Sequence, residues 1–178
     1  MKLIFTVLCF FVVMVGSAAP KVHLTPPLTN APGCTELKDQ FETPQKLSFP
    51  ATNLMVLTLA DHKGSEQIAG WVGPVKERYG LRVDIRGIAD MSAVPGWLRG
   101  TVRKKFRHQQ AYPVMLDWSG DVVKAFAAVN ECVNVLVIDE RGQILQRLTG
   151  EAKPAALQEL YATIDRALTG NKNPVAKK

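Results

Sequence analysis

Two kinds of hydrophobic pattern follow each other through the first half of the chain and predict different elements. Residues 53–60 are almost continuously apolar, which is typical of a strand covered on both faces. Residues 65–79 instead place apolar side chains at helical spacing, with Ser65 as the expected N-cap, Pro74 as a kink and Gly80 as the end. Residues 81–85 then alternate as a half-buried strand. A strand, a helix and a second strand joined by short turns predict a parallel β-α-β unit.

The C-terminal part of the chain predicts a hairpin followed by a helix. Residues 133–139 form another apolar stretch, and residues 143–148 are expected to return antiparallel to it after a tight turn at Gly142. From residue 153, apolar positions follow one helix face that ends near Gly170. A further short hairpin is expected over residues 37–49, turned near Thr43 and Pro44. Together these elements predict a small α/β sandwich.

The ends of the chain differ in composition from this domain. Residues 1–18 combine Lys2, an apolar core and small residues, as a secretory signal peptide does, with cleavage expected near Ala18 or Ala19. We therefore expect a periplasmic or secreted protein with no transmembrane segment after signal removal. Residues 19–36 are expected to form an extended leader, residues 37–170 the folded domain, and residues 171–178 a basic disordered tail.

Positive charge is in modest excess and gathers in two places, residues 99–107 and the tail 172–178. The formal net charge is +6, and removing Lys2 with the signal leaves 21 Lys plus Arg against 16 Asp plus Glu, or +5. Export argues against nucleic acid as a physiological partner. A helix starting at residues 95–98 carries the basic surface Arg99, Arg103, Lys104, Lys105 and Arg107, with Leu98, Val102 and Phe106 on another face. Such a helix either covers a sheet, contacts an anionic membrane or docks another periplasmic protein.

Several of these segments resemble thioredoxin-like proteins. Residues 54–79 look like the first strand, active-site loop and Pro-kinked helix of that superfamily. Residues 112–117 and 120–126 look like the inserted strand and short helix of its redoxin and peroxiredoxin branch, and residues 137–144 are similar to the closing hairpin. Within this branch, the chain resembles the YtfJ-like group of small exported bacterial proteins, which lack the cysteine pair. The resemblance implies a thioredoxin-like three-layer α/β sandwich, with a mixed central sheet, a C-terminal β-hairpin and a helix.

The same resemblance puts the usual chemistry in question. The family's Cys-x-x-Cys would fall on residues 63–66, which contain no thiol, and its cis-proline would fall at Cys132-Val133. A dithiol reductase needs a nucleophilic thiolate and a resolving thiol there, so standard thioredoxin or peroxiredoxin catalysis is disfavoured. The loop remains a candidate binding loop, either for an anion at the helix N-terminus or as ordinary turn and cap structure. Its residues are Asp61, His62, Lys63, Gly64, Ser65 and Glu66.

No cofactor and no metal site are predicted. Asp61 and His62 lack a third ligand, and neither His23 nor His108 has ligand-like spacing to His62. A hydrolase using Ser65 and His62 is a remote alternative, because the pair lacks the orienting context of a triad, although Asp61 and Asp117 are candidate carboxylates.

Two cysteines, Cys34 and Cys132, would remain after signal removal. They form a structural disulfide, stay as two free thiols, or act as a reversible redox switch. Two functions follow from the sequence: a non-catalytic binding or accessory protein of the periplasm, or an atypical thiol redox protein that uses Cys132 with Cys34.

Overall fold

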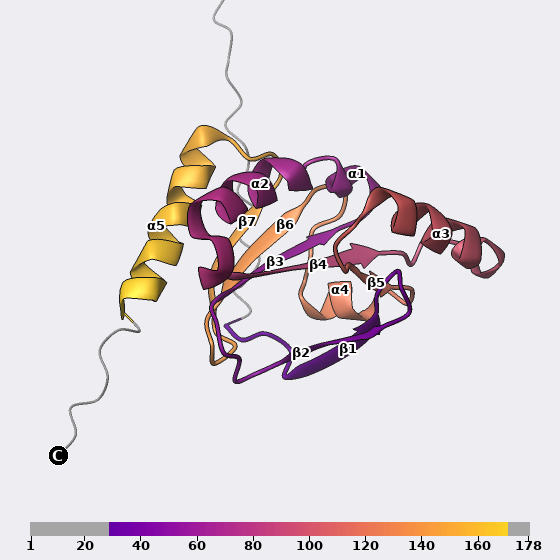
Figure 1. The fold of residues 1–178 in the computed structure, drawn as a ribbon, viewed down its shortest axis with the longest axis horizontal. Coiled ribbons are helices and arrows are strands. Elements are labelled where there is room, and N and C mark those ends of the chain that lie inside the picture. The colour runs from indigo at the N-terminus through magenta and orange to yellow at the C-terminus, as the bar shows by residue number, and fades with distance from the viewer. Residues whose placement is uncertain (1–28, 171–178) are drawn as a thin grey trace, which may run out of the picture.

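The computed structural model describes residues 29–170. The expected signal peptide, the first part of the leader and the basic tail lie outside the described residues. The described chain forms a five-stranded mixed sheet with helices and a two-stranded hairpin around it (Figure 1). The strands of the sheet are, in spatial order, β5 (Met115–Asp117), β4 (Asp84–Asp90), β3 (Met55–Ala60), β6 (Asn134–Ile138) and β7 (Ile144–Thr149). The expected three-layer α/β sandwich with a mixed central sheet is confirmed.

Strand β3 is the central strand, as its apolar sequence predicts. All six of its residues are buried, and it pairs in parallel with β4 and antiparallel with β6. Strand β4, however, begins at Asp84 and not at residue 81. Gly80 adopts a positive φ of 55° and residues Gly80–Arg82 form a 3₁₀ turn, η1, which leaves Leu81 98% exposed. The strand that was expected to start at residue 81 therefore starts three residues later, at Asp84.

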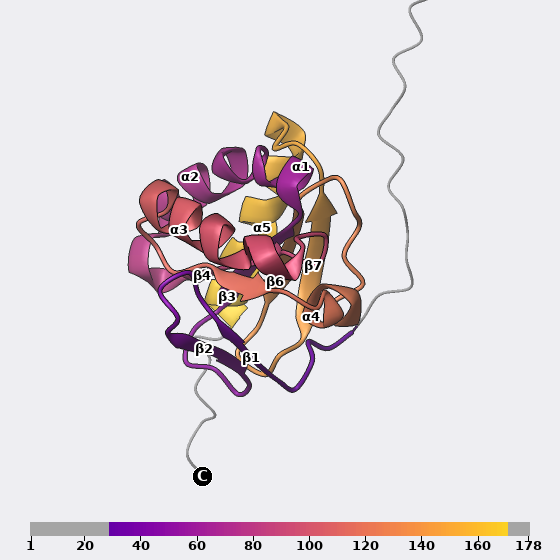
Figure 2. The same ribbon diagram turned by 90° about the vertical axis from the view of Figure 1, so that its right-hand side faces the viewer.

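Each face of the sheet has its own hydrophobic core. On one face, α2 (Ile68–Tyr79) and α5 (Pro154–Gly170) pack Trp71, Val75 and Leu160 against β3 and β6. On the other face, the hairpin contributes Leu47, and Phe126 is contributed by the C-terminal cap of the short helix α4 (Asp121–Ala125). Figures 1 and 2 show α2 and α5 on one side of the sheet and β1, β2 and α4 on the other. The C-terminal hairpin and helix are thus as predicted, with Gly142 at a φ of 90° in the turn.

The N-terminal hairpin consists of β1 (Cys34–Lys38) and β2 (Pro44–Ser48), paired antiparallel. Strand β1 starts inside the segment expected to be a leader, so residues 34–36 belong to the folded domain. Two buried polar side chains fix its turn: the Asp39 carboxylate accepts hydrogen bonds from the backbone N–H groups of Phe41 and Thr43, and Gln40 bonds to residues 110–114. The Gln40 bonds join the turn to the segment that follows a neighbouring helix.

That helix is α3 (Arg99–Gln109), preceded by the 3₁₀ turn η2 (Gly96–Leu98). The helix agrees with the prediction, but none of its residues is fully buried. Within residues 29–170, no helix is both long and apolar enough to cross a membrane.

One predicted helix start is wrong. Ser65 does not cap the long helix, because residues His62–Ser65 form a separate one-turn helix, α1, whose N-cap is Asp61. The Ser65 hydroxyl donates instead to the His62 carbonyl, 2.6 Å away, inside that turn. The helix α2 starts only at Ile68, and its N-cap Gln67 makes no side-chain capping bond.

Candidate functional site

The cysteine-free loop lies at the edge of the sheet where β3 ends. The loops that follow parallel strands meet at the same edge, and here the connection that leads into the antiparallel strand β6 joins them. Asp61 links two of these segments through its carboxylate. Its Oδ1 accepts the Gly64 backbone N–H at 2.8 Å and its Oδ2 accepts the Glu131 backbone N–H at 2.7 Å. Asp61 is therefore a cap and a cross-link at once, with both oxygens engaged.

Lys63 stands where the first cysteine of the family motif would be expected. Its Nζ lies 2.6 Å from Glu131 Oε1, with both side chains about two-thirds exposed, at 67% and 68%. The hydrogen bond to Glu131 is the main cause that raises the pKa of Lys63. Glu131 itself holds a left-handed φ of 61°, which non-glycine residues rarely adopt. An ion pair thus lies at the position that the resemblance gives to the first cysteine.

Gly64 brings the loop into direct contact with the connection before β6. A Cβ on Gly64 would lie 2.5 Å from both the carbonyl carbon and the oxygen of Cys132, and 2.8 Å from the nitrogen of Val133. The position where the resemblance places a cis-proline is therefore occupied by this peptide, packed backbone to backbone on α1. Phe49-Pro50 is the cis peptide found within residues 29–170. No side chain fits between the loop and the Cys132-Val133 peptide.

Cys132 is half-buried behind the loop. Its Sγ lies 3.6 Å from the Val129 carbonyl oxygen. Burial raises the pKa of the Cys132 thiol, and the nearby charge of Asp61 adds to the increase, while a hydrogen bond with the Gly150 backbone opposes it. Nucleophilic cysteines of redox sites have the opposite property, a lowered pKa that keeps them ionised near pH 7. The surroundings of Cys132 therefore disfavour the thiolate.

Cys34 lies far from Cys132, and both thiols are free in the structure. Just before β1, Ala31 donates its N–H to Gly142 in the turn that follows β6. Cys132 comes just before the other end of β6, which is five residues or about 17 Å long. A disulfide requires Cα atoms within about 7 Å of each other. Of the three alternatives for the two cysteines, the structure has two free thiols, and the fold directs them toward opposite ends of this strand.

The other loop residues show no catalytic arrangement. His62, Ser65 and Glu66 are exposed, and the Ser65 hydroxyl is engaged with the His62 backbone rather than with an imidazole nitrogen. Across residues 29–170, no group of three or more His, Cys, Asp and Glu side chains could hold a metal ion. His62, Ser65 and Glu66 therefore form no catalytic or metal-binding group in the described structure.

The predicted basic surface separates into two sets of residues. Arg103 and Arg107 form ion pairs with Glu42, at 2.7 and 3.4 Å, and Arg107 Nε donates to the Gln40 carbonyl at 2.6 Å. Arg99 lies over the ring of Trp118, with its guanidinium carbon 5.4 Å from the ring centroid. Lys104 and Lys105, by contrast, are exposed and have no ion-pair partner in the described part of the chain.

Sequence reasoning missed several residues that hold this region together. Asn134 is buried at the start of β6, where its Oδ1 accepts the Val129 N–H and its Nδ2 donates to the Val129 carbonyl, both at 2.8 Å. The sequence could have indicated this role, because an asparagine in the otherwise apolar stretch 133–138 needs hydrogen-bond partners when it is buried. Glu131 and Glu42 gave none, since their partners lie 68 and 61 residues away in the chain.

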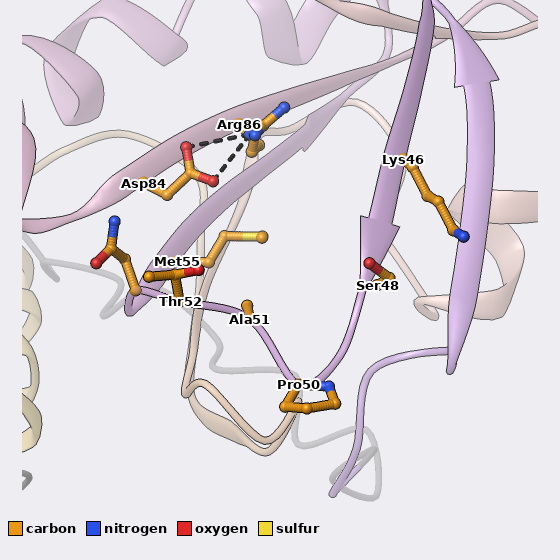
Figure 3. A pocket seen from close by; sticks show the side chains of 9 residues that line it. Lys46, Ser48, Pro50, Ala51, Thr52, Met55, Asp84 and Arg86 are labelled. Atoms are coloured by element: carbon orange, nitrogen blue, oxygen red, sulfur yellow. Dashed lines mark hydrogen bonds and ion pairs between the residues drawn. The ribbon is translucent and has the colours of Figure 1, made fainter.

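A polar pocket of about 330 Å³ opens between β2 and the starts of β3 and β4 (Figure 3). Arg86 lies at its wall, and its Nε donates to both carboxylate oxygens of Asp84, at 3.1 and 3.0 Å. The sequence did not indicate this pocket. Because Asp84 already compensates the charge of Arg86, the pocket does not present a free guanidinium to a ligand.

Comparisons with known proteins define the fold and not the chemistry. No family model matches the chain, and no curated protein matches it. A thiol:disulfide interchange protein of the thioredoxin family from Chlorobium tepidum is 18% identical, with a TM-score of 0.55 over 79% of this chain and 96% of that one. The exposed lipoprotein thioredoxin of Streptococcus pneumoniae is 13% identical, with a TM-score of 0.59 over 73% and 98%. A hypothetical protein from Sinorhizobium meliloti is 18% identical, with a TM-score of 0.59 over 86% and 90%. The chain therefore has a thioredoxin-like fold.

Proposed function

We propose that this chain is an exported, non-catalytic thioredoxin-fold protein that acts in the periplasm by binding another protein. The observation that carries the proposal is the structure of the 61–66 loop. Lys63 replaces a reactive thiol and pairs with Glu131, and Gly64 packs directly on the Cys132-Val133 peptide. A disulfide exchange site needs an accessible thiolate at this helix terminus, and the loop supplies none.

The rival function is an atypical thiol reaction between Cys132 and Cys34. Two observations weigh against it. Burial raises the pKa of Cys132, which lowers the fraction of reactive thiolate. Cys34, the second thiol that would resolve a mixed disulfide, lies toward the opposite end of β6. A structural neighbour is named as a thiol:disulfide interchange protein, but that name describes the activity of the neighbour and not of this chain.

Further support for the cellular setting comes from the sequence. Residues 1–18 have the order of charge, apolar core and small residues that directs export. We place the protein with the YtfJ-like exported group on the motifs quoted above, and this subfamily assignment is part of the proposal.

A turnover assay tests the proposal directly. The mature protein is assayed for reduction of a disulfide substrate and of hydrogen peroxide, beside Cys34→Ser and Cys132→Ser and with a dithiol thioredoxin as positive control. We expect no turnover above the uncatalysed rate in any of the three preparations. Turnover by the parent that disappears in Cys132→Ser would overturn the proposal and establish the rival.

A further inference from the structure

Helix α3 presents three distinct faces. The apolar side chains of Val102 and Phe106 in α3, and of Leu98 in the preceding turn η2, are half-buried. The three arginines, four residues apart at 99, 103 and 107, contact Trp118 and Glu42. These two faces are already used within the domain, and they fix the position of the helix beside the β1–β2 turn.

The third face is free. Its residues follow one another at spacings of four, three and four, which keeps them on one side of a helix. They are Trp97, Thr101, Lys104 and His108, with Lys105 beside them, and all five are exposed. We call this set the α3 outer surface. Trp97 is 82% exposed, which is unusual for the largest apolar side chain in a protein.

Charge on this helix is strongly one-sided. Residues Arg99–Gln109 contain five Lys and Arg residues and no carboxylate. Glu42 is the acid that pairs with them in residues 29–170, which leaves five minus one, or a formal charge of +4. A positive surface with an exposed tryptophan suits a protein partner, because Trp is among the residues that dominate the energetics of interfaces and complementary charge steers association.

We propose that the α3 outer surface docks an acidic segment of a partner protein, with Trp97 filling an apolar site on that partner. This inference rests on the proposed function, since it names where and what the protein binds. A protein fits this surface better than a membrane does. An interfacial helix buries an apolar face among the lipids, whereas the apolar side chains of α3 face the domain and only Trp97 remains outside.

The test uses two labelled acidic polymers, poly-glutamate and a glutamate-tyrosine copolymer, and vesicles of phosphatidylglycerol and phosphatidylethanolamine. Lys104→Glu/Lys105→Glu should weaken binding of both polymers by at least about tenfold. Trp97→Ala should weaken only the copolymer, by about fivefold or more. Lys124→Glu/Lys153→Glu is the matched control, because it makes the same change in net charge on exposed lysines outside α3. We expect it to bind nearly as the parent does at moderate salt.

Each opposite result counts against the docking surface. Equal weakening in the control variant would show that only net charge matters. Binding to vesicles that Lys104→Glu/Lys105→Glu abolishes, without binding to either polymer, would assign the surface to a membrane. Thiol-dependent turnover in the assay above is a separate readout, so the proposed function can fail while the α3 outer surface stands, and the reverse.

Discussion

Gly64→Ala tests the backbone contact between the 61–66 loop and the Cys132-Val133 peptide. The added methyl would lie 2.5 Å from two backbone atoms of Cys132, whereas ordinary van der Waals contact is 3.4–4 Å. The neighbouring atoms belong to the main chain, so no side-chain rotation relieves the clash, and the loop and the Cys132-Val133 peptide must separate by about 1 Å. Forcing an extra carbon into a packed site costs about 1–3 kcal/mol.

One favourable effect opposes this cost. Alanine stabilises a helix by about 1 kcal/mol relative to glycine. Because the contact is with backbone on both sides, we place the clash in the upper half of its range and expect a net loss of about 1–2 kcal/mol. For a domain of this size that corresponds to a fall in Tm of roughly 3–8 °C. Separation of the two segments should also speed alkylation of Cys132.

Gly100→Ala is the matched control. Gly100 lies in α3, and a Cβ added there meets nothing within 4 Å, so the helix preference acts alone. We expect a gain of about 0.5–1 kcal/mol. Urea unfolding followed by circular dichroism, together with iodoacetamide labelling of Cys132, measures both effects. If Gly64→Ala is as stable as the parent and Cys132 labels no faster, the backbone contact argued above is wrong.

Two further predictions concern the same edge of the sheet. Asp61→Ala should lower the free energy of unfolding in urea by about 2–3 kcal/mol, because it removes a helix cap and the bond to the Glu131 N–H. Asp61→Asn keeps one acceptor oxygen and should lower the free energy of unfolding less. Equal losses would contradict the double role of this carboxylate. In a Cys34→Ser background, Cys132 should alkylate with a midpoint pH above that of an ordinary thiol, because burial raises the pKa of Cys132. The contribution of the protonated Cys132 thiol to folding stability should be full below the ordinary thiol pKa and be lost as pH rises through the raised pKa. A midpoint at or below that of an ordinary thiol would contradict the burial of the Cys132 thiol.

Local patterns predicted the elements that local physics controls. The continuous apolar run of β3, the turn at Gly142 and the apolar face of α5 each depend on residues close in the chain, and each is confirmed. The start of α2 was missed because Ser65, followed by Glu66 and Gln67, has the composition of a cap. A one-turn helix capped by Asp61 uses the same residue types, so composition alone does not distinguish them.

For the candidate site, the sequence predicted that the loop lacks thiols but did not predict the contacts that the loop makes. The missing thiols at residues 63–66 are visible in the sequence. The closure of the loop depends on Glu131 and Cys132, about 70 residues away, and such contacts leave no local pattern. The two cysteines expected to remain after signal removal left a disulfide open, but counting cysteines does not show which end of β6 each one approaches.

The first described residues have a practical consequence for orientation. Ile144 donates its N–H to the Thr29 carbonyl and Ala31 donates to Gly142, so the incoming chain is fastened beside the β6–β7 turn. That turn and α3 lie at opposite ends of the sheet (Figure 1). A protein attached to a sensor chip through its N-terminal side would hold α1 and α3 toward the solution. Tethering at this end thus leaves the proposed docking surface free, and the same attachment site would suit a fluorescent label intended not to interfere with a partner.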